Sequence, residues 1–330
     1  MKKIIFICPY FGKYPNYFNL TLNSIKYNDT IDWLIITDIK KIYEYPQNVK
    51  IINMTFDELR EKVQSVFDFK ISLDTPYKIC DYKCAYGYIF KEYISSYDFW
   101  GHCDFDCIYG DLRKYLTENI LNKYEKVYYL GHLSLYKNIE RINKIFKCKI
   151  DEEIDYEKIY SNKEIYAFDE LGIVNILNYN DIKIYSDFSF ADIHIWDRAF
   201  TLIKAKINFE TGKMYFEIDK NKKRIFSFNN GKLYGFSIDK KDKYKIEKEE
   251  YMYIHLQKRF MDNYVNNIDE FLIIPNKFID YQDINRDFII KNTKDNILYK
   301  RYIKTRRSYN KRKDKFNFLK MIKRKIFGLK

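Results

Sequence analysis

Short apolar runs that alternate with amphipathic segments are the feature that most constrains the fold of this 330-residue chain. Runs typical of buried strands cover residues 3–8, 33–37, 49–53, 98–103 and 126–130. Helices are predicted between them over residues 16–25, 55–66 and 77–94, the second of which opens with a capping box, Thr55-Phe56-Asp57-Glu58. This alternation favours an α/β fold with a mainly parallel sheet and helices on both faces.

The second half of the chain has a different pattern, made of short β-like runs. They cover residues 207–209, 214–218, 224–228, 232–237 and 250–256. Asn229-Asn230-Gly231 predicts a tight turn between two of them. No internal repeat and no Gly/Ser linker separates the halves, which favours one domain over residues 1–299 with a β-rich C-terminal part.

The net charge of +13 is confined to the end of the chain. Residues 300–330 contain 14 Lys or Arg and one acid, Asp314, whereas the preceding 299 residues contain 45 basic and 45 acidic side chains. A neutral body argues against a nucleic-acid-binding fold, which carries its basic surface on the domain itself. We recognise no signal peptide and no membrane-spanning run, and we expect a cytoplasmic protein whose six cysteines are reduced.

Two carboxylates, Asp104 and Asp106, follow the apolar run at residues 98–103. They lie at or just past the C-terminal end of a predicted strand, and ligands of open α/β sheets bind in the crevice beyond such ends. Carboxylate oxygens bind Mg²⁺ or Mn²⁺, and such an ion can carry a substrate diphosphate. Acidic pairs in loops are also often solvated or act as caps, as we expect for Asp111, a predicted helix N-cap.

Two cysteine pairs, Cys80/Cys84 and Cys103/Cys107, raise a zinc site as an alternative. Structural zinc sites use tighter Cys-x-x-Cys turns, however, and these pairs fall on a predicted helix and a buried strand. Free cysteines in such places behave as small apolar side chains. We favour that interpretation.

The order of the predicted elements resembles the GT-A fold of nucleotide-sugar glycosyltransferases, in which a Rossmann-like half leads to a strand with Asp-x-Asp. The closer resemblance is to bacterial glycosyltransferases of capsule and lipopolysaccharide synthesis. It spans roughly residues 1–275 and is carried by blocks at residues 76–83, 97–106, 110–112, 131–138 and 168–170. It implies a nucleotide-sugar-binding half over residues 1–130 and an acceptor half over residues 131–299.

The resemblance implies that Asp104 and Asp106 hold Mn²⁺ or Mg²⁺ against the donor diphosphate. Residues 254–259 are similar to the late His-x-x-Lys segment of glycogenin-like retaining transferases, which implies His255 as a third ligand and favours retention. Neutral imidazole suits Mn²⁺ beside carboxylates, although a polar residue of an ordinary strand is the alternative for His255. Lys258, or else Arg259, would stabilise the leaving diphosphate.

Further donor contacts are implied at the ends of the early strands and on the helix before Asp-x-Asp. The base and ribose would lie against Pro9, Tyr10, Phe11 and Asp38. Asp81 and Lys83 would face the donor sugar and phosphates. Loop, capping or solvated positions are the alternatives for all six residues.

The acceptor would bind to the second half of the chain. Asp169 and Glu170 are the candidate catalytic carboxylates: one is the general base of an inverting enzyme, or both orient hydroxyls in a retaining enzyme. His132 and Asn138 follow a strand that faces the acceptor in GT-A folds. A weaker cluster is formed by Asp192, His194 and Asp197.

The tail at residues 300–330 has apolar residues at near-helical spacing between lysines. Such a basic amphipathic segment is typical of an anchor on anionic lipid, with a solvated tail and a nucleic-acid contact as alternatives. The sequence thus predicts a metal-dependent glycosyltransferase on the inner face of a bacterial plasma membrane. It would transfer sugar from a nucleoside-diphosphate donor, in first place a UDP-sugar, to a surface glycan or lipid-linked oligosaccharide. A non-catalytic, membrane-associated glycan-binding or scaffold protein is the alternative.

Overall fold

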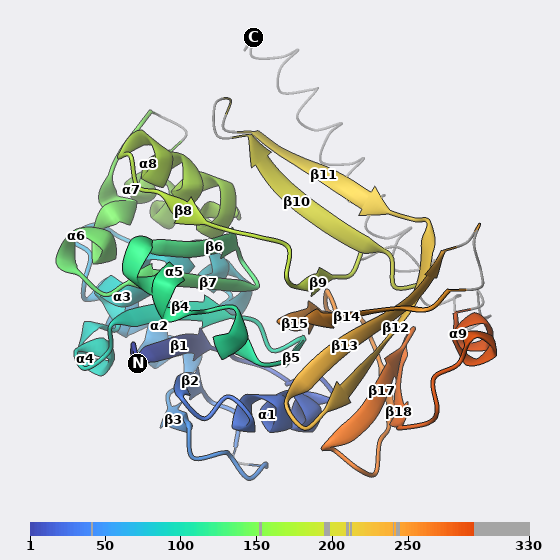
Figure 1. Ribbon diagram of the computed structural model, residues 1–330. Coiled ribbons are helices and arrows are strands. Elements are labelled where there is room, and N and C mark those ends of the chain that lie inside the picture. Colours follow the sequence, from blue (N-terminus) through green and yellow to red (C-terminus); the bar gives the residue numbers. More distant parts are fainter. Residues whose placement is uncertain are drawn as a thin grey trace, which may run out of the picture.

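The computed structural model describes residues 1–40, 42–151, 154–194, 199–208, 211, 213–239, 241 and 245–293. Figure 1 shows a sheet with helices, formed mainly by the first half of the chain, beside a group of β-sheets formed by the second half. The basic tail, residues 300–330, lies outside the described residues, so its membrane contact stays a prediction. Within the described ranges, no helix is long and apolar enough to cross a membrane.

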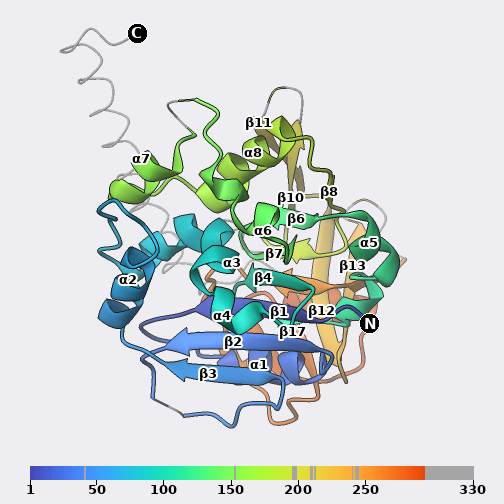
Figure 2. The ribbon, with the colours of Figure 1, turned by 90° about the vertical axis from the view of Figure 1, so that its left-hand side faces the viewer.

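A seven-stranded sheet with the order β3-β2-β1-β4-β7-β6-β8 forms the centre of the first half. Its strands are β1 (Ile4–Pro9), β2 (Ile31–Thr37), β3 (Val49–Asn53), β4 (Phe99–Cys103), β6 (Lys126–Leu130), β7 (Leu133–Lys137) and β8 (Ile184–Tyr185). The strands β1 to β4 are parallel and lie side by side in Figure 2. The α/β class is therefore confirmed, and each of the five strands predicted in this half is present.

The described sheet is mainly parallel, as predicted, with four parallel pairs out of six. It is nevertheless mixed, because β7 runs antiparallel to both β4 and β6. Only Gly131 and His132 connect β6 to β7, and a connection this short allows only an antiparallel pair. The reversal places the start of β7 beside the end of β4, where Cys103 pairs with Leu133. The turn at residues 131–132 therefore lies next to Asp104.

Helices cover both faces of the sheet, as predicted, because successive side chains of a strand point to opposite faces. Ile4 and Phe6 of β1 pack on one side with α1 (Phe18–Lys26), η2 (Leu112–Lys114) and α5 (Glu118–Lys123). Ile5 and Ile7 pack on the other side. The helices there are α2 (Phe56–Gln64), η1 (Pro76–Ala85), α3 (Tyr86–Ile89), α4 (Lys91–Ile94), α6 (Glu140–Asn143), η3 (Ile145–Lys147), α7 (Tyr156–Ser161), η4 (Phe168–Gly172) and α8 (Ile173–Tyr179).

Two predicted helix caps are present. The Thr55 hydroxyl accepts the Glu58 N–H while the Glu58 carboxylate accepts the Thr55 N–H, which completes the capping box of α2. The Asp111 carboxylate accepts the Lys114 N–H at the start of η2, which is a short 3-10 turn rather than an α-helix. Asp111 is therefore a cap, as predicted.

The single helix predicted over residues 77–94 is wrong in detail, because the segment forms three short pieces: the 3-10 helix η1, then α3 and α4. Lys78 and Asp81, three residues apart in η1, are both buried and form an ion pair with an N–O distance of 2.8 Å. Asp81 also accepts backbone N–H groups from Tyr166 and Phe168. These tertiary contacts outweigh the local preference for an α-helix.

Three β-sheets make up most of the second half, in agreement with its predicted β-rich character. The largest has the order β14-β13-β12-β17-β18-β16, and the others are β10-β11 and β5-β15-β9. Their strands are β5 (Cys107–Tyr109), β9 (Ala191–Asp192), β10 (Leu202–Asn208), β11 (Lys213–Asp219), β12 (Lys222–Asn229), β13 (Lys232–Asp239), β14 (Glu247–Tyr251), β15 (Tyr253–His255), β16 (Asp262–Tyr264), β17 (Glu270–Ile274) and β18 (Lys277–Asp280). The helix α9 (Arg286–Asn292) follows them.

The predicted turn at residues 229–231 joins β12 to β13 and has positive φ at Asn230 and Gly231, as tight hairpin turns require. The run at residues 250–256 does not form one strand. It is split at Met252 between β14, in the six-stranded sheet, and β15, in the three-stranded sheet. Because the chain changes sheets at Met252, His255 lies outside the six-stranded sheet and pairs with β5 and β9.

Gly87 provides a test of the packing between α3 and β4. A Cβ atom at this position would lie 2.3 Å from the indole ring of the buried Trp100. We expect Gly87→Ala to lower the free energy of unfolding by about 1–3 kcal/mol, the usual cost of overpacking, in urea denaturation. Ser95→Ala, at an exposed position close to α4, is the control. Equal stability of the two variants would contradict this packing.

Candidate metal centre

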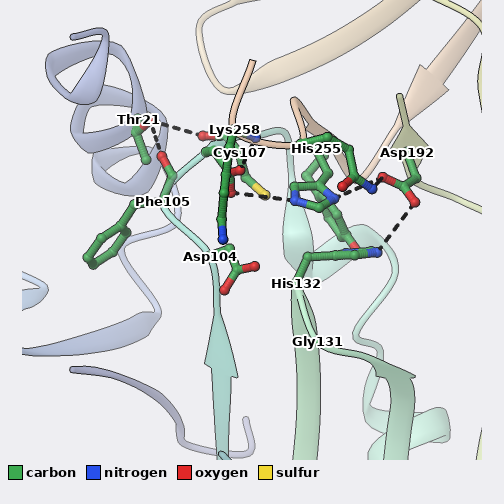
Figure 3. Close-up of polar contacts among 12 residues, drawn as sticks. Thr21, Asp104, Phe105, Cys107, Gly131, His132, Asp192, His255 and Lys258 are labelled. Atoms are coloured by element: carbon green, nitrogen blue, oxygen red, sulfur yellow. Dashed lines mark hydrogen bonds and ion pairs between the residues drawn. The ribbon is translucent and has the colours of Figure 1, made fainter. Parts of the chain in front are cut away.

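The candidate site lies at the C-terminal end of β4, where the short strand β15 lies between β5 and β9. The register pairs His255 with Cys107 of β5 on one side and with Asp192 of β9 on the other. Asp106, which precedes β5, is therefore beside His255. Figure 3 shows His255 between Asp192 and the loop that follows Asp104.

The loop that carries Asp106 is held by the first helix. The buried Thr21 hydroxyl of α1 lies within hydrogen-bond distance of the carbonyl oxygens of Phe105 (3.2 Å) and Cys107 (3.0 Å). The Tyr109 hydroxyl donates to the Asp104 carbonyl at 2.6 Å. The backbone on both sides of Asp106 is thus fixed by buried side chains.

Asp106 and His255 face each other in a buried environment. The Asp106 Oδ1 atom lies 3.5 Å from His255 Nε2, and Asp106 Oδ2 accepts the backbone N–H of Lys258. Burial opposes ionisation of Asp106, but His255 and the Lys258 N–H outweigh it and hold the pKa of this carboxyl well below its ordinary value. Asp106 is therefore a carboxylate at neutral pH.

Asp192 holds the other side of the His255 ring, with Oδ1 2.8 Å from Nδ1. Burial opposes the charged form of His255, but the two carboxylates raise the pKa of the imidazole well above its ordinary value. Gln257 Nε2 donates to the same Asp192 oxygen at 2.7 Å. A carboxylate on one ring nitrogen is the arrangement that orients metal-ligating histidines in proteins.

His132 completes this group from the turn between β6 and β7. Its Nδ1 atom lies 2.8 Å from the Tyr253 hydroxyl, and its Nε2 atom lies 4.0 Å from Asp192 Oδ2. Burial, together with the nearby His255, lowers the pKa of His132 to about 4. The imidazole is therefore neutral at physiological pH and keeps a lone pair for a ligand.

Lys83 links Asp104 to a second pair of carboxylates. The Lys83 ammonium donates to Asp104 Oδ1 and to the Gly131 carbonyl, each at 2.8 Å, and lies 3.7 Å from Asp169 Oδ2. Burial opposes its charge, but Asp104 and Asp169 raise the pKa of the amine well above its ordinary value. Lys83 is thus a permanent cation at the centre of the site.

Asp169 and Glu170 lie on η4, a π-helical turn, and reach the same place. The Gly131 N–H donates to Glu170 Oε1 at 3.0 Å, and a Cβ at residue 131 would lie only 2.7 Å from Asp169 Oδ2. Burial, which outweighs the effect of Lys83, raises the pKa of Asp169 to about 8. Burial likewise raises the pKa of Glu170. The structure thus brings both candidate catalytic residues to the Asp104 side of the site.

Among the residues that the structure describes, potential ligand atoms form two groups, each with members within 4.8 Å of one another. One contains Asp106, Cys107 and His255, and the other contains His132, Asp192 and His255. The predicted trio is therefore only partly brought together, because Asp104 belongs to neither group and is paired with Lys83. Burial raises the pKa of the Cys107 thiol well above its ordinary value.

Lys258 and Arg259, the two basic residues predicted to stabilise the leaving diphosphate, differ in their placement. Lys258 is exposed at the rim of the site, and its ammonium lies 4.1 Å from the ring centroid of Tyr77. Both Gln257 and Lys258 have a positive φ. Arg259 is buried and donates to the His194 carbonyl and to Asn276. Lys258, rather than Arg259, is therefore the cation at the site.

Asp81 does not face a ligand, which corrects its predicted role. Its carboxylate is fully buried and is shared between Lys78 and the backbone N–H groups of Tyr166 and Phe168. These contacts fix the chain that leads into η4. Asp81 therefore fixes the segment that carries Asp169 and Glu170.

The nucleotide candidates lie at the ends of β1 and β2. Tyr10, after Pro9, is close enough to the site that burial, with Asp106 and Asp104, raises the pKa of its hydroxyl to about 12. Phe11 belongs to the other face of the sheet, where its ring centroid lies 5.4 Å from that of Phe56. Asp38 is exposed directly after β2. Among the nucleotide candidates, Tyr10 is therefore the one whose hydroxyl is influenced by Asp104 and Asp106.

The acceptor candidates His132 and Asn138 lie at opposite ends of β7. His132 precedes this strand at the site, whereas Asn138 follows it and donates to the carbonyls of Ile94 and Tyr97 near the start of β4. Asn138 is therefore at the far end of the sheet, which corrects its prediction. His194 is close to β9 but belongs to neither group of ligand atoms, and Asp197 lies outside the described residues.

The sequence analysis missed Tyr253, Gln257 and Tyr77. Tyr253 and His255 alternate within β15, and a period of two places side chains on one face of a strand. This spacing is a signal by which Tyr253 can be found, whereas Gln257 lies past the end of β15 with a positive φ. Tyr77, in contrast, reaches the site only through the fold of η1, and no local pattern marks it.

The chain belongs to a family of unknown function, DUF6625, whose model matches residues 6–282. The site residues from Tyr10 to Lys258 all lie inside the matched range. No curated protein and no solved structure gives a significant match. The fold and the site thus define an α/β protein with a candidate metal centre at the edge of its main sheet.

Asp81→Asn tests the support of the site without touching its ligands. The variant leaves the ammonium of Lys78, which is 1% exposed, without its carboxylate. Breaking a buried ion pair in this way costs about 3–5 kcal/mol, so we expect a loss of that size in urea denaturation. Asp68→Asn, at an exposed position, should change stability by less than about 0.5 kcal/mol. A similarly small change for Asp81→Asn would show that the pair is dispensable.

Proposed function

We propose that this protein is a metal-dependent glycosyltransferase of the GT-A type. It transfers a sugar from a nucleoside-diphosphate donor, in first place a UDP-sugar, to a hydroxyl of a surface glycan or lipid-linked oligosaccharide. The observation that carries the proposal is the register of β15, which brings His255 to 3.5 Å from Asp106 directly after β4. A carboxylate and an imidazole at the carboxyl end of a sheet strand suit a divalent ion that holds a diphosphate.

The topology supports the proposal. Parallel strands β3-β2-β1-β4 form a Rossmann-like half, and Asp104 and Asp106 follow the last of them. The β-rich half then supplies Asp192 and His255 across the same edge. This is the order of parts expected for a GT-A enzyme, in which the donor and the acceptor meet between the halves.

The residues present fit a metal ion. Asp106 is an ionised, buried carboxylate, and Asp192 holds Nδ1 of His255 so that Nε2 faces Asp106. Asp106 and His255 would therefore hold Mn²⁺ or Mg²⁺, with Asp104 reaching the donor from its place beside Lys83. When bound, such an ion supplies charge stabilisation for a departing nucleoside diphosphate.

Lys258 and the pair Asp169–Glu170 have distinct roles in this proposal. Lys258 lies at the rim with its ammonium on Tyr77, from where it can approach a phosphate. Burial raises the pKa of Asp169 to about 8, close to neutral pH. This carboxyl can therefore act as the general base of an inverting enzyme or orient a sugar hydroxyl in a retaining one. Retention is favoured by the His255 segment alone.

The proposal is tested by nucleoside-diphosphate release from a panel of UDP- and GDP-sugars, with and without Mn²⁺. We expect Mn²⁺-dependent release from one donor, lowered at least about 100-fold by Asp106→Asn, because an interaction of about 2.7 kcal/mol or more with transition-state charge is lost. Asp111→Asn is the matched control, since asparagine caps a helix as well as aspartate does. No release and no stabilisation by any donor, with membrane glycolipid also added, would favour a non-catalytic glycan-binding protein.

Lys258→Met tests the rim cation. Loss of a charged contact with a phosphate costs about 1.5–3 kcal/mol, so we expect kcat/KM for the donor to fall about 10- to 100-fold. Lys258→Arg should keep most of the activity, because the charge remains. Lys91→Met, at an exposed position on α4, is the control for loss of a surface charge. An unchanged kcat/KM in Lys258→Met would remove this residue from the donor site.

A further inference from the structure

We propose that His132, Asp192 and His255 form a second metal-binding position, adjoining the one at Asp106 and selective for transition-metal ions over Mg²⁺. Ligand atoms of all three residues lie within 4.8 Å of one another, and all three side chains are buried. The inference does not depend on glycosyl transfer, because it concerns an ion that binds to the protein alone.

The distances fit an ion better than a direct contact. The atoms His132 Nε2 and Asp192 Oδ2 are 4.0 Å apart, which is beyond hydrogen-bond range. Nitrogen and oxygen ligands lie about 2.0–2.2 Å from Zn²⁺, which separates two ligands of a tetrahedral ion by about 3.3–3.6 Å, so a small inward movement of these side chains would bring both onto one ion. The gap between the imidazole and the carboxylate is therefore wide enough for an ion and too wide for a hydrogen bond.

His132 has an unused nitrogen that faces this gap. The residue is 5% exposed, and its Nε2 atom has no hydrogen-bond partner among the described residues. Burial of a polar atom without a partner is costly. A metal ion on Nε2 would satisfy this atom.

The surrounding contacts orient two of the three ligands, His132 and Asp192. The Tyr253 hydroxyl lies 2.8 Å from His132 Nδ1 and fixes that ring. Gln257 and His255 both contact Asp192 Oδ1, at 2.7 and 2.8 Å, which leaves Oδ2 turned toward His132. Outer contacts of this kind fix ring orientation at metal sites, and their loss lowers affinity by about 10- to 100-fold.

The donor set predicts which ions bind. Two imidazoles and one carboxylate favour Zn²⁺, Co²⁺ or Fe²⁺, whereas Mg²⁺ prefers oxygen ligands and water. Because both positions use His255, an ion at His132–Asp192 withdraws that imidazole from Asp106. We therefore expect Zn²⁺ to compete with Mn²⁺ for binding to the protein.

Metal titrations of the full-length protein test this inference. Zn²⁺ should displace Mn²⁺, followed as the return of the free Mn²⁺ signal in electron paramagnetic resonance. We expect His132→Gln to weaken Zn²⁺ binding at least tenfold while Mn²⁺ affinity changes less than twofold, and Asp106→Asn to weaken Mn²⁺ binding. His102→Gln is the matched control, because His102 is also a buried histidine with an unpartnered Nε2 among the described residues but belongs to neither group of ligand atoms.

Equal Zn²⁺ affinity in His132→Gln and wild type would overturn the inference. Since His132→Gln can also disturb folding, anomalous diffraction at the zinc edge from wild-type crystals provides an independent test. A peak between His132 and Asp192 supports the second position, and a peak at Asp106 alone, or none, overturns it. The proposed glycosyltransferase activity is decided separately, by Mn²⁺-dependent donor release in the absence of Zn²⁺.

Discussion

The pairing of β15 with both β5 and β9 is the interaction on which the site depends. A strand of three residues, Tyr253–His255, joins the two halves and places one histidine against carboxylates from two distant segments. The backbone hydrogen bonds of this small sheet set the register, and a shift by one residue would turn His255 to the opposite face. The chemistry of the site is therefore fixed by strand pairing rather than by flexible loops.

Burial of charge without full compensation is the second property of the site. Lys83 offsets Asp104 and part of the charge of Asp169, yet the carboxyl of Asp169 still has a raised pKa. On the other side, His255 lies between two carboxylates, Asp106 and Asp192. Such an arrangement costs stability in the empty protein. It is the kind of cost that proteins carry at functional sites, where a bound cation or a substrate restores the balance.

Much of the fold follows from the sequence because apolar periodicity and capping signals are local. The strands of the central sheet, the capping box at Thr55 and the turn at Asn230 were all predicted from such patterns. The division of residues 250–256 into two strands was not, because it depends on which sheets lie nearby. In the site, the roles of Asp81 and Asn138 were predicted wrongly for the same reason. The buried ion pair of Asp81 and the reversal of the chain at β7, which displaces Asn138, both depend on tertiary contacts that no local pattern shows. The proximity of Asp106 and His255 was anticipated only through a family resemblance.

The long separation in sequence between the parts of the site has a consequence for how the protein is made. Residues 106, 192 and 255 meet in one small sheet, so the first half can assemble its parallel strands during synthesis while the site is still open. Contacts between such distant segments are slow to form, because a long loop must close before they stabilise anything. A nascent chain that ends before β15 contains Asp106, His132 and Asp192 but lacks His255, the residue that both groups of ligand atoms share. Both groups are therefore completed late, when β15 pairs with β5 and β9.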